Sequence, residues 1–238
     1  MRAPFPVAAL DGRKLMGSLV AIILALGIAA APAGATTRQP VLAGAVHADG
    51  TWMYADGHTE SHTADYGLIT AVGGGTITVV RPDLQRVTVA LPSDSCVRID
   101  GMSGTVDDLH TRMRAVVLSL KADDGSLSAM AVRAGTPLLL PFQPTCGIFD
   151  GAVHADVPIT YRDGSTRSFT WDRGTVTSTD GDQVVVQHAD GSAAQAAIGQ
   201  DTRVYGGYSL AGLGHQAVVV AERIAGELIA NTIRVVKS

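Results

Sequence analysis

Residues 44–70 read GAVHADGTWMYADGHTESHTADYGLIT, and residues 151–177 read GAVHADVPITYRDGSTRSFTWDRGTVT. At the fixed offset of 107 residues, 15 of the 27 aligned positions are identical. Identity over such a length indicates that one structural unit is encoded twice in the chain. The fold therefore depends on what these two stretches form.

The alternation of identical and differing positions indicates that each stretch contains a β-strand. After GAVHAD the identities fall on every second residue, so one face of an extended strand is the same in both copies and the other differs. The identical positions are Thr59, Ser61, Thr63, Asp65 and Gly67, matching Thr166, Ser168, Thr170, Asp172 and Gly174. We expect the differing face, with His62 in one copy and Phe169 in the other, to point outward. Gly67 and Gly174 predict a bulge or bend that a Cβ atom would obstruct.

The repeat continues downstream with shortened loops. RAVVLSL at residue 114 matches QAVVVAE at residue 216, and GSLSAMAVR at residue 125 matches GELIANTIR at residue 226, at offsets of 102 and 101. Asp-Gly pairs separate segments rich in Val, Thr and Ile, which is typical of strands joined by tight turns. In the second copy these segments predict strands at residues 153–162, 165–176, 183–188, 193–198, 202–205, 217–221 and 229–236, with a short turn at 209–213.

Short strands at this spacing indicate an all-β protein. We predict two tandem small antiparallel β-barrels, because closure of each sheet would remove exposed strand edges; a β-sandwich is the alternative. The first domain would span residues 36–135 and the second residues 151–238. The Pro-rich residues 136–150 predict an extended apolar connector that lies against a domain.

The second copy resembles a known family. DRGTVTSTDGDQVVV from residue 172, DTRV from residue 201, a Ser-Leu-x-x-Leu turn from residue 209 and a closing pair of valine-rich strands are similar to small secreted bacterial β-domains of unknown function. The resemblance covers most of the second copy and, less closely, the first, where Asp94-Ser95-Cys96-Val97 stands in place of DTRV. It implies an extracytoplasmic β-barrel, here as a tandem repeat, and supplies no catalytic residues.

The N-terminus predicts a signal peptide at residues 1–35. Three basic residues precede an uncharged apolar run at residues 15–31, and Ala33-Gly34-Ala35 supplies the small residues that signal peptidase accepts. We expect cleavage after Ala35; the alternative is an uncleaved membrane anchor, because the run approaches the ~20 residues of a membrane span. The basic residues are Arg2, Arg13 and Lys14. The protein would be secreted or held in the cell envelope.

Charge and composition narrow the classes of partner. Removal of residues 1–35 leaves 15 basic and 21 acidic residues, a formal charge of −6. An acidic surface repels phosphate backbones, so we expect no nucleic-acid partner. No cofactor-binding loop recurs in both copies, so we expect no cofactor, and we expect membrane contact only through an uncleaved signal segment.

Cys96 and Cys146 are the two cysteines of the chain. Outside the cytoplasm they could form a disulfide across 50 residues, and two free or intermolecular thiols are the alternative. A free Cys96 would permit a cysteine-dependent envelope enzyme, because SDSCVR at residues 93–98 resembles the Ser-His-Gly-Cys-x-Arg motif of L,D-transpeptidases. That motif's His and Gly are Asp94 and Ser95 here, and a neighbouring carboxylate disfavours the thiolate. We therefore expect no catalytic residue.

Histidines of the first copy form the one candidate metal site. His58 and His62 would share a face of an extended strand, and His47 lies nearby in the sequence, so these three side chains could bind zinc. Only His47 has a histidine counterpart in the second copy, His154. We favour the alternative, in which the hairpin histidines are exposed and His47 and His154 are repeated structural hydrogen-bonding groups.

Trp52, Tyr54, Tyr161 and Trp171 are candidates for a binding surface, since exposed aromatic side chains stack on sugars and anchor protein interfaces. We favour burial instead, because the chain has only 11 aromatic residues to pack inside it. By elimination, the sequence predicts a non-catalytic exported module, structural or adhesive, that contacts protein or glycan in the cell envelope or outside it. The enzyme at Cys96 and the zinc-binding module are the alternatives.

Overall fold

The computed structural model describes residues 43–135, 146–180, 182–206 and 213–236. These residues form 14 β-strands and one single-turn 3-10 helix, η3 (Val106–Asp108), so the all-β prediction is confirmed. The first copy contains β1 (Ala45–Tyr54), β2 (Thr59–Gly73), β3 (Thr76–Val80), β4 (Arg86–Ala90), β5 (Cys96–Ile99), β6 (Met102–Gly104), β7 (Arg114–Lys121) and β8 (Leu127–Ala134). The second contains β9 (Ala152–Tyr161), β10 (Thr166–Ser178), β11 (Gln183–Gln187), β12 (Ala193–Tyr205), β13 (Gln216–Ile224) and β14 (Glu227–Val236).

The strands predicted for the second copy match the observed ones, except that β12 runs unbroken through two segments predicted separately. The predicted signal peptide, residues 136–145 of the predicted connector and residues 209–212 of the predicted turn lie outside the described residues. Within the described ranges, no helix is long and apolar enough to cross a membrane.

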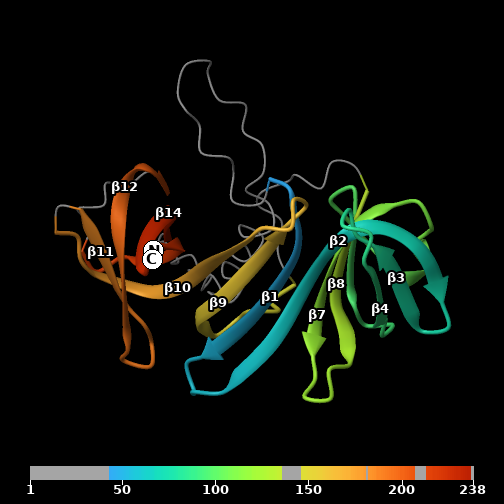
Figure 1. Ribbon diagram of the computed structural model, residues 1–238. Coiled ribbons are helices and arrows are strands. Elements are labelled where there is room, and N and C mark those ends of the chain that lie inside the picture. The colour runs from blue at the N-terminus through green and yellow to red at the C-terminus, as the bar shows by residue number, and fades with distance from the viewer. Residues whose placement is uncertain (1–42, 136–145, 181, 207–212, 237–238) are drawn as a thin grey trace, which may run out of the picture.

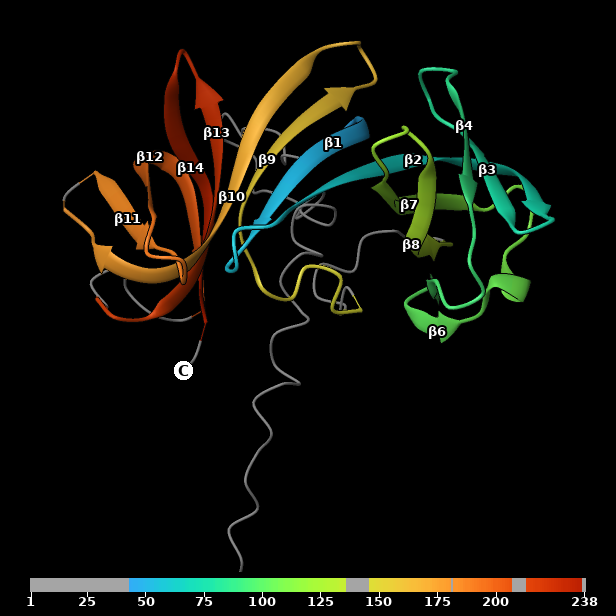
Figure 2. The same ribbon diagram turned by 90° about the horizontal axis from the view of Figure 1, so that it is seen from below.

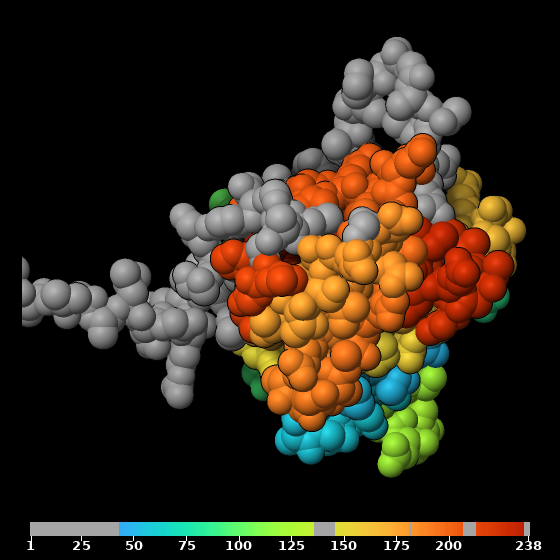
Figure 3. Space-filling model, turned by 90° about the vertical axis from the view of Figure 1, so that its left-hand side faces the viewer, coloured from blue at the N-terminus to red at the C-terminus, as the bar shows by residue number. Residues whose placement is uncertain are grey.

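The strand pairings within each copy close into a cycle of five. In the second copy, β10 pairs β11, β11 pairs β12, β12 pairs β14, β14 pairs β13, and β13 returns to β10. In the first copy the same order runs through β2, β3, β4, β8 and β7. β4 and β5 pair with successive parts of β8, on the same edge of that strand. Seen from its end, the orange and red residues of the second copy pack into one convex surface beside the blue and cyan residues of β1 and β2 (Figure 3).

The pairing differs from the predicted antiparallel pattern at one place in each cycle. β12 pairs β14 in parallel, and β4 and β5 both pair β8 in parallel. The reason is geometric, because strands that alternate in direction around a closed ring must be even in number. A cycle of five strands therefore needs at least one parallel pair.

The two copies are joined into one 14-stranded sheet by their first strands. β1 and β9 run side by side and antiparallel in the middle of the molecule (Figures 1 and 2). Trp52 pairs with Ala155, the counterpart of Ala48, and Ala48 pairs with Ile159, the counterpart of Trp52. Two identical subunits that meet about a two-fold axis have this reciprocal form. The chain is therefore built as an internal pseudo-dimer.

Three apolar clusters fill the molecule. One is formed by strands of the first cycle and one by strands of the second, and the third lies between the copies. The differing face of β2 and β10 belongs to the shared cluster, and His62 and Phe169 are both 2% exposed, so the expectation that this face points outward is wrong. The residues that differ between the copies pack together in the cluster between them. There the small Ala64 of one copy has the bulky Trp171 as its counterpart in the other.

Gly67 and Gly174 lie where long strands pass close to their neighbours. A Cβ atom at Gly67 would overlap the carbonyl oxygen of Val80, and one at Gly174 would overlap that of Gln187. Bulges follow in both strands, between Ile69 and Ala71 of β2 and at the equivalent place in β10. The backbone cannot move aside as a flexible side chain can, so both bends need glycine.

Candidate functional site

Each copy buries one carboxylate at the same position and holds it with a histidine. The strand register places His47 opposite Asp65, and His154 opposite Asp172. The Nδ1 atom of His47 lies 2.9 Å from Asp65 Oδ1, and that of His154 lies 2.7 Å from Asp172 Oδ1. Both aspartates are almost fully buried. The repeated histidines are thus hydrogen-bonding groups of the fold, as we expected.

A third group completes each cluster and differs between the copies. In the first copy, Arg81 donates from Nη1 to Asp65 Oδ1 at 3.1 Å and places its fork on Asp83 at 3.1 and 2.7 Å. In the second, the equivalent residue is His188, whose Nε2 lies 3.2 Å from Asp172 Oδ1 as an ion-pair contact. Sequence reasoning missed both residues, because they lie beyond the stretch of identities and are themselves different. Only the offset of 107 could have related them.

Protonation in the second cluster is shifted by its own members. The hydrogen bond to Asp172 raises the pKa of His154, against the opposing effect of burial. Burial would raise the pKa of Asp172, but its contacts with His154, His188 and Thr170 outweigh burial and lower it. The cluster therefore favours a charged imidazole beside a charged carboxylate.

Ser192, His188 and Asp172 lie in the order of a hydrolytic triad. Ser192 Oγ lies 2.9 Å from His188 Nδ1, but it also donates to Asp190 Oδ1 at 2.7 Å. The amides that would form an oxyanion hole are already used, since Gly191 donates to the His188 carbonyl and Ser192 donates to Asp190. The first copy has Gln85 at the position of Ser192. The arrangement braces a turn and does not form a nucleophile.

The structure divides the candidate zinc ligands between two places. His62 Nε2 contacts Glu60 Oε2 at 2.9 Å, and burial lowers the pKa of His62. His58 stacks on Tyr54 with ring centroids 4.2 Å apart, while His47 is held by Asp65. No group of three His, Cys, Asp or Glu side chains in the described part of the chain is arranged to hold a metal ion. The three candidate zinc ligands therefore do not meet at one site in the described residues.

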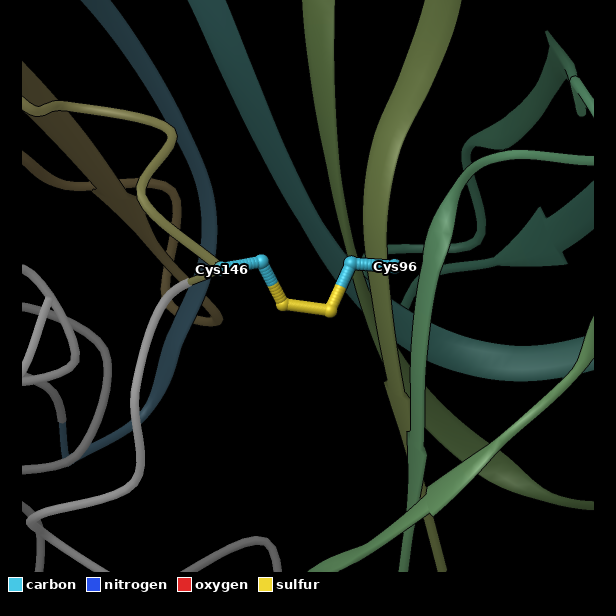
Figure 4. The surroundings of a disulfide bond; sticks show 2 residues. All are labelled: Cys96 and Cys146. Carbon is cyan, nitrogen blue, oxygen red and sulfur yellow. A yellow bond between two sulfur atoms is a disulfide. The ribbon is translucent and has the colours of Figure 1, made fainter. Parts of the chain in front are cut away.

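Cys96 and Cys146 are joined by a disulfide, with Cα atoms 6.3 Å apart (Figure 4). The bond links β5 of the first copy to the segment that leads into β9. Neither cysteine is free. A cysteine-dependent reaction at Cys96 needs a free thiolate, and the sulfur of Cys96 is bonded to that of Cys146.

The four aromatic residues named as candidates for a binding surface are buried, so the burial that we favoured is confirmed and the binding surface is wrong. Trp52, Tyr54, Tyr161 and Trp171 are 4%, 8%, 7% and 1% exposed and belong to the cluster between the copies. Trp52 stacks on Phe149 with ring centroids 3.8 Å apart and lies 5.2 Å from Trp171. Large apolar rings release most water when they pack together, so they form the junction of the two copies.

In comparisons with known proteins, no family model, curated protein or solved structure matches the chain.

Proposed function

We propose that this chain is a non-catalytic module, exported through its signal peptide, that contacts protein or glycan in the cell envelope or outside it. The disulfide supports this proposal because such bonds persist in oxidising compartments. The buried His–Asp clusters support it as well, since their polar groups are used to hold strands together. The pseudo-dimer would present two copies of one scaffold at a fixed spacing.

The observation that carries the proposal is Leu84, at the tip of the β3–β4 hairpin. Its φ is +68° and its side chain is 83% exposed. The equivalent turn residue of the second copy is Gly191, with φ +87°. A leucine in this conformation is strained, and exposing it to water gains nothing for the fold. We infer that Leu84 contacts a partner outside the chain.

Of the two classes of partner, protein is favoured. An exposed leucine suits an apolar pocket on a protein, whereas sugars are bound by exposed aromatic faces. The tryptophans of this chain are buried.

The test is retention of the purified protein on envelope fractions. We expect retention on untreated envelopes and loss of retention after protease treatment of those envelopes. Leu84→Gly should weaken retention while raising the melting temperature, because glycine relieves the strain. Exposed Leu213, changed by Leu213→Gly, is the matched control and should leave retention unchanged. Retention equal to wild type in Leu84→Gly, or turnover of peptidoglycan fragments by the protein, would refute the proposal.

A further inference from the structure

One face of the first copy carries two arginines side by side. Arg98 of β5 pairs directly with Arg133 of β8, and Arg98 also pairs with Ser103 of β6. Residues paired in this way point to the same side of a sheet. The row continues from Arg133 to Val116 of β7 and then to Tyr66 of β2. The hydroxyl of Ser103 and the guanidinium groups of Arg98 and Arg133 therefore lie in line across β6, β5 and β8.

This row lies on the side of the sheet opposite the first cycle's own cluster, where its members Val116 and Tyr66 pack toward the cluster between the copies. Val97 directly precedes Arg98, and Val132 directly precedes Arg133. Both valines are buried in the apolar cluster of the first cycle, and successive side chains of a strand alternate, so both arginines point to the opposite face. Both arginine side chains are partly exposed, and Ser103 is exposed. The arginine end of the row is therefore partly open to solvent.

The positive charges of the row are not balanced. Elsewhere arginines place their forks on carboxylates, as Arg167 does on Glu222 at 2.6 Å from both Nε and Nη2. Across the ranges that the structure describes, neither Arg98 nor Arg133 has a hydrogen-bonding or ion-pair partner, and the Nε of Arg98 is buried without one. Burial and the charge of Arg98 lower the pKa of Arg133. Like charges placed directly opposite each other destabilise a sheet.

We propose that Arg98, Arg133 and Ser103 bind a tetrahedral oxyanion, a phosphate or sulfate group. Two guanidinium forks match such an anion in geometry, and its double negative charge balances theirs. A carboxylate would neutralise only one of the two arginines. The protein is otherwise acidic, so the pair selects a small anion and not a polyanion.

The site belongs to the first copy. The equivalent row of the second copy contains Arg173, Val218, Arg234 and Tyr205. Arg173 and Arg234 are already engaged by other groups. The inference stands on the register of β5, β6 and β8 and does not depend on the proposed function.

The experiment is titration of the purified protein with inorganic phosphate against chloride at matched ionic strength. We expect phosphate to raise the melting temperature by about 5 °C or more at a hundredfold excess over Kd, and to shift the Nε–H resonance of Arg98. Sulfate should act similarly, and acetate less. Glycerol 3-phosphate should equal phosphate if the natural ligand is a phosphate ester, and should fall below it if the ligand is the free ion.

Variants locate the effect. Arg98→Gln and Arg133→Gln should each abolish the response, and both should melt no lower than wild type without phosphate, because the repulsion is gone. Ser103→Ala should weaken the response severalfold, and exposed Arg86→Gln on β4 should keep it in full. The inference is overturned if phosphate and chloride act alike on wild type, if acetate matches phosphate, or if Arg98→Gln responds as wild type does.

Discussion

The two copies surround the same buried carboxylate with different side chains. Asp65 is held by His47 and Arg81, whereas Asp172 is held by His154 and His188. An arginine remains charged at any pH that proteins meet, while a histidine can lose its proton near neutrality. The aspartate and its first histidine are placed by strand register, which the copies share. The second partner comes from the turn after β3 or β11, where the residue differs between the copies. One backbone therefore holds the same carboxylate with a histidine and an arginine in one copy and with two histidines in the other.

The largest difference between the copies should come from the disulfide, which ties β5 of the first copy to the segment before β9. Cys96→Ser with Cys146→Ser releases a loop of 50 residues and should lower the free energy of unfolding by about 4 kcal/mol, measured by urea denaturation. Arg203 occupies the equivalent position of the second copy and is exposed, so Arg203→Ala is the matched control and should cost under about 0.5 kcal/mol. A loss below about 1 kcal/mol in the double variant would contradict this account.

The glycine bends should behave alike in both copies. Gly67→Ala and Gly174→Ala each place a Cβ atom against a backbone carbonyl, and each should lower the free energy of unfolding by about 3 kcal/mol. Gly199 is the control, because its added Cβ would meet Ile229 Cγ2 at 3.5 Å and Thr202 Oγ1 at 3.9 Å, both ordinary van der Waals contacts. Unequal costs at Gly67 and Gly174, beyond about 1 kcal/mol, would show that the copies do not share this backbone.

Loss of the buried carboxylate should cost more in the first copy than in the second. Asp65→Asn removes one of the two carboxylates that contact the mostly buried Arg81, whose charge cannot be lost, and should lower the free energy of unfolding by about 3 kcal/mol. Asp172→Asn leaves no arginine beside the lost carboxylate, so it should cost roughly half as much. Chemical denaturation of both variants at one pH measures the difference. The reverse order would contradict the assignment of Arg81 as the permanent charge.

The smallest effect is a pH dependence of the second copy. A histidine with a raised folded pKa contributes stability that is complete below its unfolded pKa and is lost as pH rises through the folded value. The cost of His154→Gln should therefore be larger near pH 5 than near pH 8, by about 1 kcal/mol. Because the pKa of Asp172 is lowered, its contribution is present above the unfolded pKa of an aspartate and is lost as the pH falls further toward the folded value, on the acid side of this range. Exposed His110→Gln gives the baseline for loss of an imidazole; a cost of His154→Gln that does not vary with pH relative to this baseline would refute the prediction.

Local features of the fold were predictable, and long-range pairings were not. Turn residues and the alternation of β-branched side chains located the strands of the second copy, and the period of two located β2 and β10. The parallel contact of β12 with β14 and the pairing of β1 with β9 join segments far apart in the chain, so no local pattern encodes them. The inward direction of the differing face was missed because the pseudo-two-fold junction was unknown.

The candidate site was predictable in part for the same reason. The repeat identified His47 and His154, since identity between the copies singled them out. Arg81 and His188 were not predicted, because they are different residue types at equivalent positions. Only the structure shows that both contact the buried carboxylate of their copy. The arginine pair at Arg98 and Arg133 is set by the register of β5 against β8, which the sequence does not reveal.

The central claim is that the two copies form one body through β1 and β9. Hydrogen–deuterium exchange followed by mass spectrometry tests it most directly, by comparing peptides from residues 45–54 and 152–161 with peptides from β7 and β13. Because the junction strands carry the shared aromatic core, we predict that their amides exchange as slowly as those of the two cycles, through unfolding of the whole protein. Rapid exchange at the junction, with both cycles still protected, would show two independent domains and contradict the account.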